Sequence, residues 1–342
     1  MHAVVLREYG GPEKLKWEEA PTPEPQAGEA LIRVRAVSVD IYQSVLRRGL
    51  AVDIELPLII GNGIAGTVSA LGPNASGVAI GARVVVCNNV SCGDCRYCRR
   101  GRETLCAGRA ILGGQRNGGY AEFVAVPARD CVPLPESISF EQACLIPNTI
   151  APVVKACSRR ANIHPGENVL IVGAGGGLGI HAVQAARACG GRVIAAMRSM
   201  RAADAVKRAG ADVIVSTAEP DWGEQVRHHT DGWGADAALD FVANKETLKA
   251  SLDALALGGS LVIMGYFPRG SVFETPTWVF SAERTVTGNR SAGRRDVEDT
   301  IGLIATGRID PVIDQVLPLR DAVAAHKRFD GRQCIGRDVL VP

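Results

Sequence analysis

Several features that would assign a function class are missing from this 342-residue sequence. No uninterrupted apolar run reaches about 18 residues, and no positively charged, apolar leader follows Met1, so we expect neither membrane insertion nor secretion but a cytoplasmic protein. Charge of one sign is not in excess, since 38 Lys and Arg balance 36 Asp and Glu. This balance argues against nucleic acid or membrane partners. Aromatic residues make up only 5%, so composition reveals neither the size nor the polarity of the small-molecule substrate that we expect.

Cysteine, by contrast, is present ten times, which in an intracellular chain favours metal binding or burial over disulfides. The spacing Cys-x2-Cys-x2-Cys-x7-Cys predicts one structural zinc, because four thiolates complete a tetrahedral site and leave no position for substrate. An iron–sulfur cluster or four unliganded thiols are the alternatives, although exposed free thiols would be reactive. The predicted ligands are Cys92, Cys95, Cys98 and Cys106.

A glycine-rich turn gives the clearest prediction of a ligand. Residues 169–172 are an apolar run typical of a buried parallel strand, and five of the seven residues 173–179 are glycines. Residues 192–197 are a second strand, which completes a βαβ unit. Glycines let a pyrophosphate approach bare amides at a helix N-terminus, where the dipole favours anions. With alanine in the first position of the dinucleotide fingerprint, the predicted contacts are Ala174, Gly175, Gly176, Gly177, Leu178 and Gly179.

The residues after the second strand indicate which dinucleotide binds. A carboxylate that accepts the ribose hydroxyls of NAD usually lies about 20 residues beyond the glycines, but Met197 occupies that position, and Arg198, Ser199 and Arg201 follow. Two guanidiniums and a hydroxyl can bind a 2′-phosphate, so NADPH is predicted over NADH. The alternative is that both arginines are simply solvated at a helix start.

The cysteine loop and the glycine turn, in this order, resemble those of the zinc-type medium-chain dehydrogenases and reductases. The likeness also rests on Ala3-Val-Val-Leu, Gly118-Gly-Tyr-Ala-Glu-Phe and Gly336-Arg-Asp-Val-Leu-Val-Pro. It implies an α/β chain with a GroES-like β-rich catalytic domain over 1–148, which includes a structural-zinc lobe at 87–112. A Rossmann domain with a doubly wound parallel sheet would cover 149–286, and 287–342 would return to the catalytic domain. A homodimer or homotetramer is also implied, with a strand in 278–289 that can pair between subunits.

At the positions where this family holds a catalytic zinc, the chain carries other residues. The family's Gly-His-Glu motif is replaced by Gly61-Asn62-Gly63, and its two cysteine positions hold Asp40 and Asn148. A catalytic zinc needs three imidazole, thiolate or carboxylate ligands, so we predict that it is absent. Asn62 and Asn148 would donate N–H groups to an oxygen that becomes negative, Tyr42 would donate a proton, and Asp40 would orient these groups or shuttle protons. The alternative is that the two asparagines and the tyrosine only cap backbone groups.

Four further positions are expected beside the nicotinamide, because ligands of open α/β sheets lie at the carboxyl ends of strands. They are Phe241, Val242, Gly265 and Tyr266. Arg337 resembles the arginine that contacts the cofactor in this family.

Together these observations predict an NADPH-dependent oxidoreductase that reduces a polarised carbon–carbon double bond in an enone, enal or enoyl substrate. Hydride would add to the β-carbon, the amides would stabilise the enolate, and Tyr42 or water would protonate the α-carbon. A carbonyl or quinone reductase that needs no zinc is the second possibility. A protein that binds NADPH without catalysis is the third.

Overall fold

The computed structural model describes residues 1–50, 54–265 and 277–342, and these form two compact units. Unit 1 contains Met1–Ala151, Ser291–Thr306 and Pro311–Pro342, and unit 2 contains Pro152–Arg290 and Gly307–Asp310. The chain thus leaves unit 1, completes most of unit 2 and returns. Four residues of unit 2 interrupt this return, and no sequence pattern indicates that interruption.

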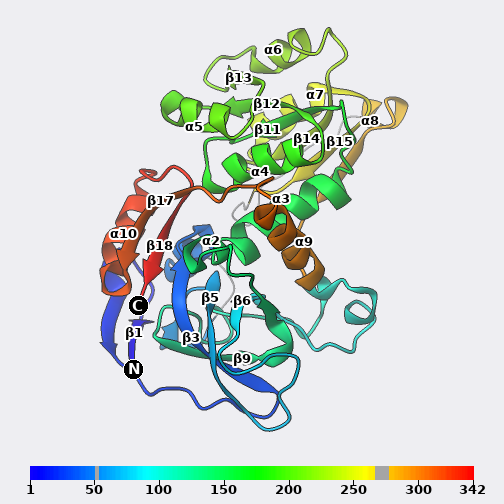
Figure 1. The fold of residues 1–342 in the computed structure, drawn as a ribbon. Helices are drawn as coiled ribbons and strands as arrows, with labels where there is room; N and C mark the ends of the chain where they lie inside the picture. Colours follow the sequence, from blue (N-terminus) through cyan, green and yellow to red (C-terminus); the bar gives the residue numbers. More distant parts are fainter. Residues whose placement is uncertain (51–53, 266–276) are drawn as a thin grey trace. The chain divides into compact units, whose positions relative to one another are not determined.

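Unit 1 is built on a seven-stranded sheet with the order β10-β6-β5-β3-β18-β17, in which β9 also pairs with β3. The long central strand β3 buries most of its apolar side chains, and the C-terminal strand β18 pairs with it in antiparallel register (Figure 1). Val339 lies opposite Ser38 in this register, so the start of β18 and the end of β3 are adjacent. The strands are β3 (Glu29–Ser38), β5 (Ile64–Leu71), β6 (Arg83–Val86), β9 (Phe123–Pro127), β10 (Cys131–Pro133), β17 (Ile313–Pro318) and β18 (Arg337–Val341).

Two smaller sheets complete the β-structure described for unit 1. One has the order β2-β1-β4 and the other pairs β7 with β8. Fully buried Leu6, Ile32, Ile64 and Tyr120 belong to one continuous apolar core. The strands are β1 (His2–Leu6), β2 (Leu15–Glu19), β4 (Leu58–Ile59), β7 (Asn89–Val90) and β8 (Ala110–Ile111).

The helix that follows β3 is held at its C-terminal half by a hydrogen bond and an ion pair with Asp330. Ser44 donates to Asp330 Oδ1 at 2.7 Å, and the fully buried Arg47 donates to Asp330 Oδ2 at 2.6 Å. Breaking a buried ion pair typically costs about 3 to 5 kcal/mol, so this contact fixes the helix firmly. The helices of unit 1 are α1 (Ile41–Arg47), α2 (Phe140–Ala143), α9 (Arg294–Ala305) and α10 (Ala322–Asp330), with a π-helical turn η5 (Ile146–Ile150); α3 (Ala151–Lys155) crosses the boundary between the units.

Unit 2 contains a six-stranded parallel sheet with the order β13-β12-β11-β14-β15-β16. The strand order reverses between β11 and β14, as expected of a doubly wound sheet. The predicted fold class is therefore confirmed. The strands are β11 (Asn168–Val172), β12 (Arg192–Met197), β13 (Val213–Ser216), β14 (Ala235–Asp240), β15 (Leu255–Ile263) and β16 (Thr285–Gly288).

The helices of unit 2 connect these parallel strands. α4 packs on β11 and β12, and α7 packs on β14 and β15. In the segment 278–289, where the sequence suggested one strand, a short helix precedes β16, and β16 pairs with β15 of the same chain. The helices are α4 (Gly177–Ala188), α5 (Ala203–Arg208), α6 (Trp222–His228), α7 (Lys245–Asp253) and α8 (Trp278–Ser281), with a π-helical turn η6 (Ala156–Arg160). Of the helices in the described ranges, none has the length and apolar character needed to cross a membrane.

Candidate functional site

Asp40 is fully buried at the N-terminus of α1, where it caps the helix. Its Oδ1 accepts a hydrogen bond from the backbone N–H of Tyr42 at 2.9 Å. Its own backbone N–H donates to Oε1 of Gln43 at 2.7 Å, which completes a capping box. Capping occupies only one of its two carboxylate oxygens.

The second carboxylate oxygen of Asp40 ends a chain of side-chain amides. Asn148 donates from Nδ2 to Asp40 Oδ2, and its Oδ1 accepts from Asn88 at 3.1 Å. Asn89 donates to Asn88 Oδ1 at 2.8 Å, and Arg109 donates to Asn89 Oδ1 at 2.6 Å. Guanidinium groups only donate and carboxylates only accept. The two ends therefore fix the orientation of every amide between them.

Arg337 supplies a positive charge near Asp40. It is the first residue of β18, and its Nε donates to Thr149 Oγ1 at 3.2 Å. Burial raises the pKa of Asp40 above its usual value, and the charge of Arg337 and the hydrogen bond from Asn148 partly oppose this rise. Burial also lowers the pKa of Arg337, against the opposing charge of Asp40. Because Asn148 and Thr149 are neighbours in the π-helical turn η5, one turn contacts both charged groups.

Asn62 lies between two glycines that leave no space for larger side chains. Gly61 has a φ of +100°, and a Cβ there would lie 2.3 Å from the ring of Tyr120. A Cβ on Gly63 would lie 2.1 Å from Ser38 Oγ. The position that holds glutamate in the family's Gly-His-Glu motif therefore has no room for a carboxylate in this fold.

The side chain of Asn62 is oriented by Gln43. Asn62 is only 1% exposed, and its Oδ1 accepts a hydrogen bond from Gln43 Nε2 at 2.5 Å. Within residues 1–50, 54–265 and 277–342, its side chain takes part in this one hydrogen bond and donates none. Its two N–H bonds are available to a ligand oxygen. Asn148, in contrast, uses one of its N–H bonds on Asp40.

Tyr42 is partly buried, and its hydroxyl group lies against the backbone at Gly114. A Cβ on Gly114 would come within 2.6 Å of the Tyr42 Oη atom. The structure thus connects Asp40 and Asn148 directly and Asn62 to Asp40 through Gln43. Tyr42 joins this group through its backbone N–H.

The residues that sequence reasoning missed are Gln43, Asn88 and Thr149. Asp40-x-x-Gln43 is a readable signal, because a capping residue followed three positions later by Gln is typical of a helix start. Asn88 and Thr149 carry no comparable local signal. Their roles depend on contacts with distant parts of the chain.

Among the described residues, two groups of His, Cys, Asp and Glu side chains are close enough to bind a metal. One group is the predicted cysteine set, and the other consists of Asp314, Cys334 and Asp338. Arg328 already contacts both carboxylates of the second group. Asp40 belongs to neither.

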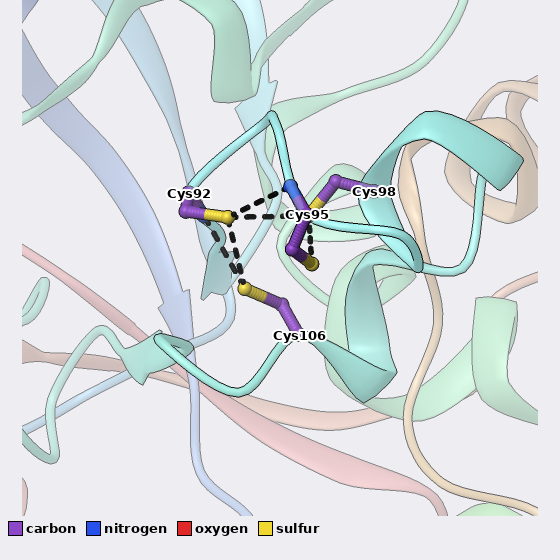
Figure 2. A group of neighbouring side chains, drawn as sticks. All are labelled: Cys92, Cys95, Cys98 and Cys106. Atoms are coloured by element: carbon purple, nitrogen blue, oxygen red, sulfur yellow. Dashed lines mark hydrogen bonds between the residues drawn. The ribbon is translucent and has the colours of Figure 1, made fainter.

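The four cysteines of the predicted zinc site converge (Figure 2). Cys92 Sγ lies 3.9 Å from Cys98 Sγ and 3.5 Å from Cys106 Sγ, and Cys95 Sγ lies 3.5 Å from Cys98 Sγ. Zinc–sulfur bonds of about 2.3 Å in a tetrahedron place sulfurs about 3.8 Å apart. Backbone N–H groups of Asp94 and Cys95 lower the pKa of Cys92 to about 6, which favours a thiolate. The cluster therefore fits a structural zinc.

The glycine turn lies at the carboxyl end of β11, where the strand order reverses. Gly173 has a φ of +84°, and a Cβ on Gly179 would lie 2.2 Å from the Gly173 carbonyl oxygen. Helix α4 begins after Gly176, which has no side chain to cap it. Backbone N–H groups of the first turn are thus available to an anion such as a dinucleotide pyrophosphate. In this turn Ala174 is buried and Gly176 is exposed.

The residues predicted for a 2′-phosphate follow the carboxyl end of β12. Arg198, Ser199 and Arg201 are exposed. Ser199 accepts a hydrogen bond from the backbone N–H of Arg201 at 3.4 Å. Its hydroxyl can still donate to an anion.

The positions predicted beside the nicotinamide follow the next strands. Phe241 and Val242 directly follow β14, and Val242 donates its backbone N–H to Asp240 Oδ1 at 2.8 Å. Gly265 follows β15 closely, and a Cβ there would lie 2.6 Å from Ala243 Cβ. These segments are therefore adjacent. Tyr266 lies outside the described residues.

Comparison with known proteins identifies relatives along the whole chain. The alcohol dehydrogenase GroES-like domain matches residues 26–136, and the zinc-binding dehydrogenase family matches 177–306. An NAD-dependent alcohol dehydrogenase of Saccharolobus solfataricus is 32% identical over 351 residues, with 100% of both chains covered. An acryloyl-coenzyme A reductase of Sulfurisphaera tokodaii is 29% identical over 344 residues, also with 100% of both covered. The crystal structure of AibC has a TM-score of 0.95 and 36% identity, and covers 100% of this chain and 96% of that one.

Proposed function

This chain belongs to the medium-chain dehydrogenase/reductase superfamily, and from that premise we propose that it is an NADPH-dependent reductase of polarised carbon–carbon double bonds without a catalytic zinc. Membership itself makes it an oxidoreductase that uses a nicotinamide cofactor. The kind of bond reduced, the choice of NADPH and the missing catalytic metal are our proposal.

The absence of a catalytic zinc is supported by the chemistry of the side chains. Asn62 and Asn148 are amides, which are poor zinc ligands, and only Asp40 offers a carboxylate. Both oxygens of Asp40 already accept hydrogen bonds. In addition, Gly63 has no room for a side chain next to Ser38.

The observation that carries the proposal is the orientation of Asn62. Its carbonyl oxygen is held by Gln43, so its two N–H bonds remain for a substrate oxygen. An enoyl carbonyl becomes an enolate when a hydride adds to the β-carbon, and an N–H donor stabilises the charge that develops on its oxygen. Zinc is not required for that role.

The residues at the carboxyl ends of β11, β12 and β14 would hold the cofactor, which supplies the hydride when it is bound. The bare amides after Gly176 would bind its pyrophosphate, and Arg198 and Arg201 would bind a 2′-phosphate. Asn62 would donate to the substrate oxygen. The α-carbon would then take a proton from Tyr42 or water, which completes a saturated product.

The names of relatives support two outcomes. Acryloyl-coenzyme A reductases, at 29% identity, are consistent with an enoyl substrate and give acyl-coenzyme A thioesters as the first to test. NAD-dependent alcohol dehydrogenases, at 30% and 32% identity, favour a second candidate, which is carbonyl reduction with NADH. The main argument against NADH is the sequence Met197-Arg198-Ser199, which lacks the carboxylate that usually binds the ribose hydroxyls of NAD.

Product analysis separates these candidates. We expect purified protein with NADPH to convert an unsaturated ketone or an acryloyl thioester to the saturated compound. An allylic alcohol from the ketone would instead establish carbonyl reduction. Absence of turnover with enones, quinones and aldehydes, together with intact cofactor binding, would contradict both and favour a protein that only binds NADPH.

A substitution tests the role of Asn62 in that reaction. Asn62→Leu removes both N–H donors, and loss of such a donor typically lowers kcat by about a hundredfold or more. The matched control is Asn117→Leu, since Asn117 is an exposed asparagine of the same unit that accepts from the backbone N–H of Ile59 at 3.0 Å. We expect kcat to fall only in the first variant. An effect confined to KM would contradict the proposed role.

A further inference from the structure

Gln43 is a fully buried amide that the predicted site does not include. Its Oε1 accepts a hydrogen bond from the backbone N–H of Asp40 at 2.7 Å. A backbone N–H can only donate, so the Gln43 amide has a single orientation in this contact. Its Nε2 must then face Asn62.

This orientation determines that of Asn62. The Nε2 atom of Gln43 donates to Asn62 Oδ1 at 2.5 Å. If the Asn62 amide were turned by 180°, two NH2 groups would face each other without an acceptor, and a buried donor without a partner typically costs about 1 to 3 kcal/mol. The backbone of Asp40 therefore sets the direction of Asn62 through one intermediate side chain.

We propose that Gln43 is a positioning residue that makes Asn62 a hydrogen-bond donor, and not an acceptor, toward the substrate oxygen. This inference rests on the proposed function, because it concerns the group that stabilises the enolate. A turned Asn62 would present its carbonyl oxygen to a developing negative charge. Binding of the cofactor would not change, but the chemical step would be slower.

The substitution Gln43→Glu tests this directly. The introduced carboxylate keeps the length of the side chain, and one of its oxygens can still accept from the Asp40 N–H. Its other oxygen can only accept, so Asn62 must turn and donate Nδ2 to it. We expect kcat at pH 8 to fall by about a hundredfold, as for loss of an oxyanion donor, with the KM for the cofactor unchanged.

The pH profile of Gln43→Glu provides a second readout, and it also reflects the ionisation of Asp40, whose carboxylate interacts with the side chain of residue 43. At low pH the introduced carboxyl gains a proton and can donate to Asn62 Oδ1 again. The ratio of variant kcat to wild-type kcat should therefore rise as pH falls. A ratio that stays low and constant across pH in a folded variant would overturn the proposal, and so would a kcat equal to that of the wild type at pH 8.

The matched control is Gln142→Glu. Gln142 occupies the equivalent capping-box position of α2, where its Oε1 accepts from the backbone N–H of Ser139 at 3.1 Å. The change in charge and the capping role are the same, but Asn62 is not a partner. We expect an unchanged kcat and pH profile. A similar loss in this variant would assign the effect to helix capping.

Neutron diffraction from deuterated crystals supplies a test that does not depend on turnover. In the wild type, deuterium should lie on the Asn62 atom that faces away from Gln43, and in Gln43→Glu on the atom that faces residue 43. Deuterium toward Gln43 in the wild type would overturn the inference, even if the variant does not fold. A wild type that reduces no double bond would refute the proposed function while this orientation is still measured.

Discussion

Asn148 donates its side-chain N–H to Asp40, which is 108 residues earlier in the chain. This contact gives the two predicted amides different roles. Asn148 donates one N–H group to the carboxylate of Asp40, and its side-chain oxygen accepts a hydrogen bond from Asn88. Asn62 keeps both donors. In the proposed reaction, Asn62 would therefore contact the substrate oxygen and Asn148 would position Asp40.

The orientation of Asn148 should depend on Asn88. In Asn88→Asp, a carboxylate oxygen would face Asn148 Oδ1, so Asn148 should turn and present its oxygen to the carboxylate of Asp40. Two acceptors would then repel, and the pKa of Asp40, already raised by burial, should rise further. The part of the pH dependence of kcat that reflects ionisation of Asp40 should therefore move to higher pH.

The control for this change is Asn117→Asp, which keeps an oxygen acceptor for the backbone N–H of Ile59. Its pH profile should match that of the wild type. If Asn88→Asp only lowers stability in urea and leaves the profile in place, Asn88 has no influence on Asp40.

Metal analysis should find one zinc per chain. The four cysteine sulfurs fit one tetrahedral ion, and Asp40 belongs to neither group of possible metal ligands in the described parts of the chain. Removal by a chelator, or Cys106→Ser, should lower the melting temperature because the loop loses its cross-link. Arg109 lies three residues after Cys106 and begins the amide chain, so kcat should fall as well. Two zinc ions per chain would contradict the proposal that this protein has no catalytic zinc.

Cofactor preference should depend on Arg198. We expect kcat/KM to be at least about tenfold higher with NADPH than with NADH, since a charge-assisted contact to a phosphate contributes about 1.5 to 3 kcal/mol. Arg198→Ala should reduce this value for NADPH and leave NADH unaffected. Arg208→Ala, an exposed arginine at the end of α5, is the control. An NADH preference in the wild type would refute the assignment.

Stability should depend on pH through Asp130. Burial raises its pKa to about 7, against the positive charges of Arg129 and Arg294, and its Oδ2 has no hydrogen-bond partner in the described parts of the chain. A carboxyl with a raised pKa in the folded state favours folding below its unfolded pKa of about 4. This contribution is lost as pH rises through about 7.

Asp130→Asn removes this dependence, because its amide does not ionise. The variant should be more stable than the wild type at pH 8, by on the order of 2 to 4 kcal/mol, and the difference should shrink toward pH 5. Urea unfolding at both values measures it. If the free energy of unfolding varies with pH in the same way in both proteins, ionisation of Asp130 does not destabilise the fold.

Local sequence patterns were sufficient for much of the fold. The apolar run at β11, its glycine turn and the next strand are neighbours in the chain, so periodicity alone indicated a βαβ unit. The start of β15 has no clear local pattern, because the strand continues through Gly258 and Gly259 and glycines usually indicate a turn. The zinc site could be predicted for the same reason as the glycine turn, because its four cysteines lie close together in the sequence.

The site was less accessible to sequence reasoning. Resemblance located Asp40, Asn62 and Asn148, but their division of roles depends on which neighbour takes each oxygen. Those neighbours, Gln43 and Asn88, are selected by packing between segments far apart in the chain. No local rule predicts such contacts.

The amide chain from Arg109 to Asp40 also limits the paths by which protons can travel. Water and hydroxyl chains conduct protons because each member can both accept and release one. A carboxamide keeps its hydrogens on nitrogen and accepts only through oxygen. The three asparagines therefore do not relay protons to Asp40. Any proton that it exchanges must arrive by another route, and because Gln43 is also a carboxamide, the link from Asp40 through Gln43 to Asn62 does not supply that route.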